Sequence, residues 1–181
     1  MEDVFNVFRD DSRRAFSWDN LGDIKHGRGD LGEEMPVIVY RLMQFTLLDA
    51  LSSDLGITKA NEYFRSAGYM AGIEFATHLL NLKLDFDSFV SHLQQSLKQL
   101  KIGILRMEFF NPEDGEIVLT VAEDLDCSGL PITNDSVCVY DEGFISGILE
   151  SYTGKKYEVR ETDCWATGDR VCRFRGAPKG E

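Results

Sequence analysis

Apolar residues recur every three or four positions through most of the first hundred residues, which is the spacing of one face of an α-helix. Pro36 opens the first such run and Gly56 closes it, as proline and glycine do at helix ends. A second run begins at Thr58, a suitable capping residue, and reaches about Leu82. A third run begins at Asp85. The first half of the chain is therefore predicted to be helical.

The second half changes to the alternation that is typical of β-strands. The pattern predicts two hairpins, one around the turn NPEDGE and one around the turn ATGD, with strands over 102–110, 117–121, 155–161 and 171–175. A helix over 138–152 lies between the hairpins, and Gly154 ends it. Helices followed by hairpins indicate an α+β fold in which N-terminal helices pack on an antiparallel sheet.

The residues before Pro36 are polar and rich in charge. Phe5, Phe8, Phe16 and Trp18 suggest short docking segments in this region. The stretch GDIKHGRGDLGEE contains four glycines and predicts a loop. We therefore expect a lead segment, one folded domain and a short tail, with boundaries at 1–18, 19–176 and 177–181.

Composition narrows the function classes. The 181 residues suit one domain, and a net charge of −12 disfavours binding to nucleic acid or to anionic membrane surfaces. Apolar runs such as 35–40 are much shorter than the roughly 20 residues that span a bilayer. The acidic N-terminus has no apolar signal core, so we expect a cytoplasmic protein.

Cysteine placement carries the most specific chemistry. Two cysteines, Cys164 and Cys172, flank the tight turn of the last predicted hairpin, and Cys138 begins the inserted helix. Three sulfurs and the Glu161 carboxylate would complete a tetrahedral, structural metal site with no open position. The alternative is that these cysteines are packing residues. Cys127, in the loop before the inserted helix, either has no role or replaces Glu161 in a four-cysteine site suited to zinc, iron or an iron–sulfur cluster.

The segment CVYDEGFISGILESYTGKKYEVRETDCWATGDRVCRFRG resembles the C-terminal part of the V4R (4-vinyl reductase) domain. The resemblance rests on three features: the helix Gly-Phe-Ile-x-Gly-Ile-Leu-Glu, the turn Glu-x2-Cys-x-Ala-x-Gly-Asp and the closing Cys-x-Phe. It extends more weakly upstream and covers about 19–175, so the expected folded domain is V4R-like.

This resemblance implies a ligand-binding fold that dimerises through its N-terminal helices. Related sensor domains of aromatic-responsive bacterial activators hold a structural zinc, through three cysteines and a glutamate, beside a buried hydrocarbon pocket. Carried over position by position, the zinc ligands are Cys138, Glu161, Cys164 and Cys172. Relatives that bind phenol orient it with a histidine and a tryptophan, for which this sequence offers no clear counterpart.

Two further sets of residues follow from helical and strand spacing. Small residues recur every four positions at Gly68, Gly72 and Ala76, which indicates close packing inside the chain or, as the resemblance favours, a dimer face. Aromatic and methionine side chains that form either core or pocket walls are Tyr69, Phe75, Phe86, Phe89, Met107, Phe109, Phe144 and Trp165.

The sequence therefore predicts a non-enzymatic sensor or binding domain for a small hydrophobic or aromatic ligand, with structural zinc. We expect it to signal through a homodimer or through a fused or separate output domain. One alternative is a metal or redox sensor that uses all four cysteines with iron or an iron–sulfur cluster. A lesser alternative is a tetrapyrrole vinyl reductase or its accessory, although the sequence contains no dinucleotide-binding motif.

Overall fold

The computed structural model describes residues 16–180, so Phe5 and Phe8 of the predicted docking segments lie outside the described residues. The chain divides into two compact units with a boundary between Glu33 and Glu34, and each unit is described by itself. The first contains a 3-10 helix, η1 (Trp18–Leu21), and a short helix, α1 (Ile24–Gly27).

Helix α1 corrects the prediction of a loop over this stretch. The Asp23 carboxylate accepts a hydrogen bond from the His26 backbone N–H at 3.1 Å, and its other oxygen lies 2.7 Å from His26 Nδ1. An aspartate at this position satisfies a free N–H of the first turn, which is enough to close one turn in a glycine-rich stretch.

The second unit begins with three helices, α2 (Val37–Leu55), α3 (Ile57–Leu79) and α4 (Phe86–Gln99), which confirms the predicted helical half. The Asp85 side chain caps α4 by accepting from the Ser88 N–H. Buried residues of α4 follow the spacing that predicted it. Within 16–180, the helices fall short of the length and apolarity that a bilayer crossing requires.

The sheet has four antiparallel strands in the order β1-β2-β4-β3. Their bounds are β1 (Ile104–Phe110), β2 (Ile117–Ala122), β3 (Tyr157–Asp163) and β4 (Cys172–Pro178). Helix α5 (Val139–Thr153) precedes β3, and the 3-10 helix η2 (Trp165–Thr167) lies between β3 and β4. The predicted α+β class is confirmed, and β4 extends two residues into the segment expected to be a tail.

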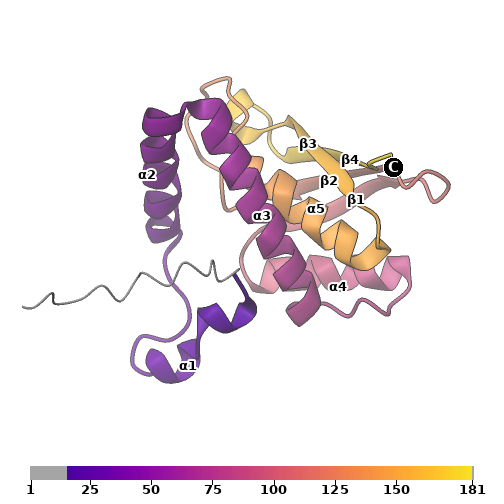
Figure 1. Cartoon of the computed structure of the whole chain (residues 1–181), viewed down its shortest axis with the longest axis horizontal. Coiled ribbons are helices and arrows are strands. Elements are labelled where there is room, and N and C mark those ends of the chain that lie inside the picture. Colours follow the sequence, from indigo (N-terminus) through magenta and orange to yellow (C-terminus); the bar gives the residue numbers. More distant parts are fainter. Residues whose placement is uncertain (1–15, 181) are drawn as a thin grey trace, which may run out of the picture. The chain divides into compact units, whose positions relative to one another are not determined.

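Helices and sheet enclose one hydrophobic core. Helix α4 packs against β1, α5 packs against β3, and α3 lies along α5 (Figure 1). Side chains of all these layers meet in a cluster that includes Phe89 of α4, Ile117 and Leu119 of β2, and Phe174 of β4, each at most 2% exposed. Burial of each such side chain stabilises the fold by roughly 1.5–3 kcal/mol relative to exposure.

Glycines bring the backbones of α3 and α5 into direct contact. A Cβ atom on Gly68 would lie 2.0 Å from the Tyr140 carbonyl oxygen, and one on Gly72 would lie 2.1 Å from that of Phe144. Ala76, the third small residue of the predicted dimer face, is fully buried. Helix α5 of the same chain therefore lies against Gly68 and Gly72, so these two residues form a contact inside the chain in place of the expected dimer face.

Candidate functional site

Four cysteines from four segments meet at one end of the sheet. Cys127 lies in the loop after β2, and Cys138 is the residue before the first turn of α5. Cys164 lies between β3 and η2, and Cys172 is the first residue of β4. All four are free thiols with an exposure of at most 1%.

The four sulfur atoms lie within 4.8 Å of one another. Cys138 Sγ is 3.9 Å from Cys164 Sγ and 3.7 Å from Cys172 Sγ, and Cys127 Sγ is 3.0 Å from Cys172 Sγ. A tetrahedral ion with metal–sulfur bonds of about 2.3 Å requires sulfur–sulfur distances of about 3.8 Å. The all-sulfur donor set suits a thiophilic ion, and the two Cys138 distances match this spacing, whereas the Cys127–Cys172 distance is shorter.

The thiols of the cluster influence one another's ionisation. Contact with Cys127 and the other thiols lowers the pKa of Cys164, because they stabilise its thiolate. Contacts with Cys127 and Cys164 raise the pKa of Cys138 and of Cys172, and burial also raises both. One thiolate is thus favoured in the metal-free cluster, whereas ionising all four sulfurs requires a cation among them.

Glu161 lies beside the cysteines but outside the group of four. One carboxylate oxygen accepts hydrogen bonds from the Ser136 hydroxyl and, at 3.3 Å, from the Cys138 backbone N–H. The other oxygen, Oε1, is buried and has no hydrogen-bond partner among the described residues. Burial, together with the charge on Cys164, raises the pKa of Glu161 to about 7.

Three more carboxyl groups surround the cysteines. Burial raises the pKa of Asp124 to about 6, raises that of Asp126, and raises that of Asp141 well above its ordinary value. Asp124 Oδ1 accepts from the backbone N–H groups of Asp126 and Cys127, at 2.8 and 3.2 Å. Oδ2 of Asp126 and Oδ2 of Asp141 are buried and unpartnered among residues 16–180. This concentration of buried acceptors favours a cation or hydrogen-bond donors at the centre.

Helix α2 is bonded to the loop that carries Cys127. Tyr40 donates its hydroxyl hydrogen to Asp126 Oδ1 at 2.8 Å. The Arg41 guanidinium donates to the carbonyl oxygens of Leu125 at 2.8 Å and Ser128 at 2.9 Å. The loop is therefore held from both sides, by the core and by α2.

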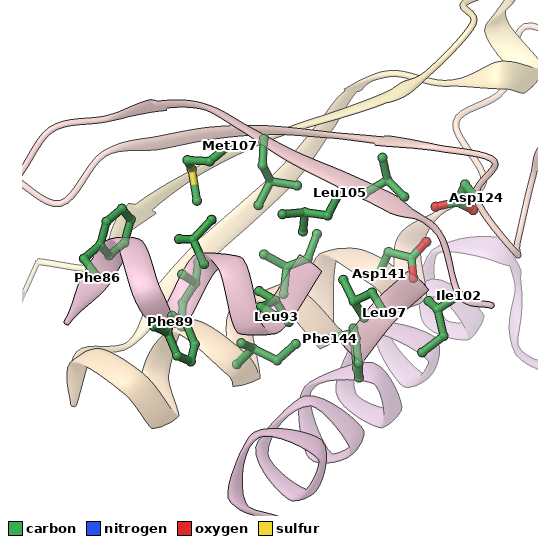
Figure 2. A pocket seen from close by; sticks show the side chains of 16 residues that line it. Phe86, Phe89, Leu93, Leu97, Ile102, Leu105, Met107, Asp124, Asp141 and Phe144 are labelled. Atoms are coloured by element: carbon green, nitrogen blue, oxygen red, sulfur yellow. The ribbon is translucent and has the colours of Figure 1, made fainter. Parts of the chain in front are cut away.

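An apolar cavity begins at the same carboxyl groups. It lies between α4, α5, β1 and β2, and its walls include Phe89 and Leu93 of α4 and Ile148 of α5 (Figure 2). Asp124 and Asp141 are its polar lining residues. Its volume is about 40 Å³, whereas an apolar cavity of roughly 150 Å³ holds benzene. The cavity must therefore widen before it admits an aromatic ring.

The structure divides the predicted pocket residues into two groups. Phe86, Phe89, Met107 and Phe144 line the cavity. The others lie elsewhere. Tyr69 donates to Glu150 at 2.7 Å in a polar groove between α3 and β3, and Phe75 packs edge-on against Phe144. Phe109 is 48% exposed, and the Trp165 indole donates to the Leu130 carbonyl oxygen.

Sequence reasoning missed the polar end of this cavity. Asp124 and Asp141 had no assigned role, because acidic residues in a chain with a net charge of −12 are expected at the surface. A usable signal was nevertheless present, since Asp141 lies three residues after Cys138 in the first turn of α5. That spacing places the two side chains on the same side of the helix.

Comparison with known proteins links this site to one family. The sequence model of the V4R domain matches residues 117–178, from β2 to β4. A protein of Methanocaldococcus jannaschii, uncharacterized protein MJ1642, is 30% identical over 145 residues, which cover 80% of this chain and 79% of that protein.

Solved structures share the fold at low sequence identity. The phenol-responsive sensory domain of the transcription activator PoxR, crystallised with phenol, aligns with a TM-score of 0.63 at 14% identity, covering 81% of this chain and 76% of that one. A vinyl-4-reductase family protein from Methanocaldococcus jannaschii aligns with a TM-score of 0.58 at 15% identity, covering 83% and 85%.

Proposed function

Because this chain belongs to the V4R domain family, we propose that it is a non-enzymatic sensor domain for a small hydrophobic or aromatic ligand, stabilised by a structural zinc ion. The observation that carries the proposal is the apolar cavity, which ends at Asp124 and Asp141, two carboxyl groups that lie within 4.8 Å of the Cys138 sulfur. A ligand that enters the cavity lies beside the centre and changes the packing of α4 on the sheet.

The donor chemistry supports zinc on Cys127, Cys138, Cys164 and Cys172. A fully sulfur-ligated, buried ion has no open coordination position, so it would supply structure and not catalysis. It would hold together the loop after β2, the start of α5 and the ends of β3 and β4. Glu161 would then accept hydrogen bonds next to the centre, and its alternative role as a ligand in place of Cys127 is tested below.

The cavity walls support an apolar ligand. Its lining residues from α4, β1 and β2 are almost all aliphatic or aromatic, as in sites that bury small organic molecules. PoxR, whose sensory domain has the same fold, responds to phenol. A ligand that binds the widened cavity stabilises that state over the collapsed one, which is the shift in population that a sensor requires.

The surface of α2 supports a homodimer. This helix contributes one buried residue, Gln44, and exposes a row of apolar side chains that includes Val37, Ile38 and Leu42. It carries few charges, so a second copy meets little repulsion there despite the net charge of −12. We further propose that the protein acts in the cytoplasm and passes its signal to an output domain, which is either fused to this chain or a separate protein.

The proposal is tested by native mass spectrometry on protein purified without added metal or ligand. We expect one zinc ion for each chain, because each chain has one four-sulfur site. We also expect a co-purified apolar molecule that is released on denaturation. Protein that carries neither, and whose melting temperature is unchanged by a chelator, would reject the sensor with structural zinc.

A metal or redox sensor is the second candidate, and the all-sulfur donor set is the observation that favours it. Four buried thiolates hold iron or an iron–sulfur cluster as well as zinc. Iron in the metal analysis, together with a visible absorbance band that bleaches on reduction, would favour this function. A colourless, zinc-containing protein would exclude it.

A further inference from the structure

The polar end of the cavity is built to accept hydrogen bonds. Figure 2 shows the carboxyl groups of Asp124 and Asp141 together at one end, beside Ile102, with Phe86 and Met107 at the other end. Oδ2 of Asp141 is buried and has no hydrogen-bond partner among the described residues. A buried acceptor without a donor is destabilising, so a bound molecule that supplies the donor gains affinity.

No lysine, arginine or histidine lines the cavity within 16–180. Two further carboxyl groups lie nearby: Asp126, whose backbone N–H donates to Asp124 Oδ1, and Glu161, which accepts from the Cys138 backbone N–H. The cavity therefore offers buried carboxyl groups at this end and no group that pairs with an anion. A fatty acid or another carboxylate would find no cationic partner there and would add a further acid to those already buried.

We propose that the ligand of this cavity is an apolar or aromatic molecule whose head donates hydrogen bonds to Asp141 and Asp124, an amine or a hydroxyl, and that carboxylates are excluded. This inference rests on the proposed function, since it concerns the head group of the ligand that the cavity binds. A cationic amine binds best, because its positive charge stabilises the ionised form of the buried carboxyl groups and its hydrogen bonds to them are then charge-assisted.

The ligand body enters at the other end. Phe86, Val90 and Met107 line both the closed cavity and an open groove of about 490 Å³ between α4 and the edge strand β1. These three side chains are therefore the partition between cavity and solvent. Their displacement joins the two spaces and gives the room that an aromatic ring needs.

The test is a calorimetric titration of the intact, zinc-loaded chain with four probes that share a phenyl-alkyl body: 2-phenylethylamine, 2-phenylethanol, propylbenzene and 3-phenylpropanoate. We expect the amine to bind about 10- to 100-fold more tightly than propylbenzene. The alcohol should fall between them, and the carboxylate should bind no better than propylbenzene. Equal affinities for all four would overturn the inference on the head group and leave the apolar pocket standing.

The variant Asp141→Asn tests whether Asp141 causes the preference for the amine. The readout is the ratio of amine to propylbenzene affinity within each variant, so that a general disturbance of the cavity, which weakens both probes, does not change it. We expect Asp141→Asn to bring the ratio close to one. The matched control is Asp54→Asn, an exposed acid near the end of α2 that lines neither the cavity nor the outer groove, and its ratio should stay at the wild-type value. The reverse result would overturn the assignment to Asp141.

Leu93→Ala separates failure of this inference from failure of the proposed function. Leu93 is buried in the cavity wall, and its truncation enlarges the cavity without touching the polar end. We expect every probe except the carboxylate to bind this variant more tightly, with the wild-type order kept. If neither this variant nor the wild type binds any probe, the apolar ligand site itself is wrong.

Discussion

Cys127 and Glu161 are the two candidates for the fourth position at the metal centre. The Cys127 sulfur lies among the other three, whereas both Glu161 hydrogen bonds go to Ser136 and to the backbone of Cys138. A soft ion prefers the sulfur to the carboxylate oxygen. The choice decides whether this chain shares the donor set that its resemblance implies.

We expect Cys127→Ser to lose most of the bound metal, and Glu161→Gln to keep it. Loss of a structural ion removes more than about 3 kcal/mol of stability, which lowers the melting temperature of a chain of this size by roughly 6–12 °C. Metal analysis and calorimetry of both variants check the prediction. Metal retained in Cys127→Ser and lost in Glu161→Gln would assign the fourth position to Glu161.

At the scale of single residues, the sequence indicated most of the cysteine cluster. The short spacing of Cys164 and Cys172 across a turn, and Cys138 at a helix start, pointed to a shared site, and the structure brings these sulfurs together. The position of Cys127 was open, because it lies in a loop whose path no periodicity determines. The role of Asp141 was hidden, because a carboxyl group becomes a cavity wall only through tertiary packing.

Helices α3 and α5 are the elements whose contact holds the site in place. Their glycines occur in matching pairs, Gly68 and Gly72 on α3 and Gly143 and Gly147 on α5. Each pair lets the backbone of one helix approach carbonyl groups of the other. Since α5 carries Asp141 and begins at Cys138, this contact also sets the position of the centre and the cavity.

We expect Gly72→Ala to destabilise the fold by about 2–3 kcal/mol, because the added methyl group would overlap the Phe144 carbonyl group and force the helices apart. Gly29→Ala is the control, since nothing lies within 4 Å of its Cβ position. Urea unfolding measures both, and the control should stay within about 0.5 kcal/mol of the wild type. Equal stability of the two variants would show that the α3–α5 contact is loose.

Sequence periodicity predicted the helices and strands better than it predicted which of them pack against one another. Three- and four-residue spacing gave α2 to α5, and alternation gave the four strands, because these patterns are local. For the small residues on α3 the pattern left close packing inside the chain and a dimer face open, with the dimer face favoured, and α5 of the same chain lies against Gly68 and Gly72. Their matching pair on α5 lies about seventy residues away, and a local pattern does not show which distant face covers it.

The distribution of apolar surface is a property of the whole molecule. Core side chains of α4, α5 and the sheet are buried, whereas α2 leaves Leu42 59% exposed. We expect the chain to be a dimer through this face, and Leu42→Arg to make it monomeric. Ile132→Arg, at a loop position that is 66% exposed, should leave the dimer intact. Sedimentation velocity distinguishes these states, and a monomeric wild type would reject the dimer.

The response of stability to pH also belongs to the whole molecule. In metal-free protein, burial raises the pKa of Asp124 to about 6 and that of Glu161 to about 7. These groups hold their protons more tightly in the folded chain than in the unfolded chain, where carboxyl groups titrate near pH 4. Their contribution is therefore present at low pH and is lost as pH rises through 6 and 7. Exposed acids with a lowered pKa, such as Glu108, act only at lower pH.

We expect the melting temperature of chelator-treated protein to fall between pH 5.5 and pH 8. Zinc-loaded protein should behave in the opposite sense, because thiols must lose protons to bind the ion and so bind it better at high pH. Thermal scans of both forms across this range check the prediction. Parallel curves for the two forms would contradict a metal centre built on these thiols.

The bonds from Tyr40 and Arg41 to the loop after β2 have a consequence for how a signal leaves the domain. That loop carries Cys127 and two carboxyl groups, and α2 carries the apolar surface offered to a second chain. Binding of a metal or a ligand that shifts this loop, even by less than about 1 Å, would therefore also shift the position of α2. If the proposed dimer forms, occupancy of the buried cavity would thus reach its interface through the hydrogen bonds of two adjacent residues, Tyr40 and Arg41.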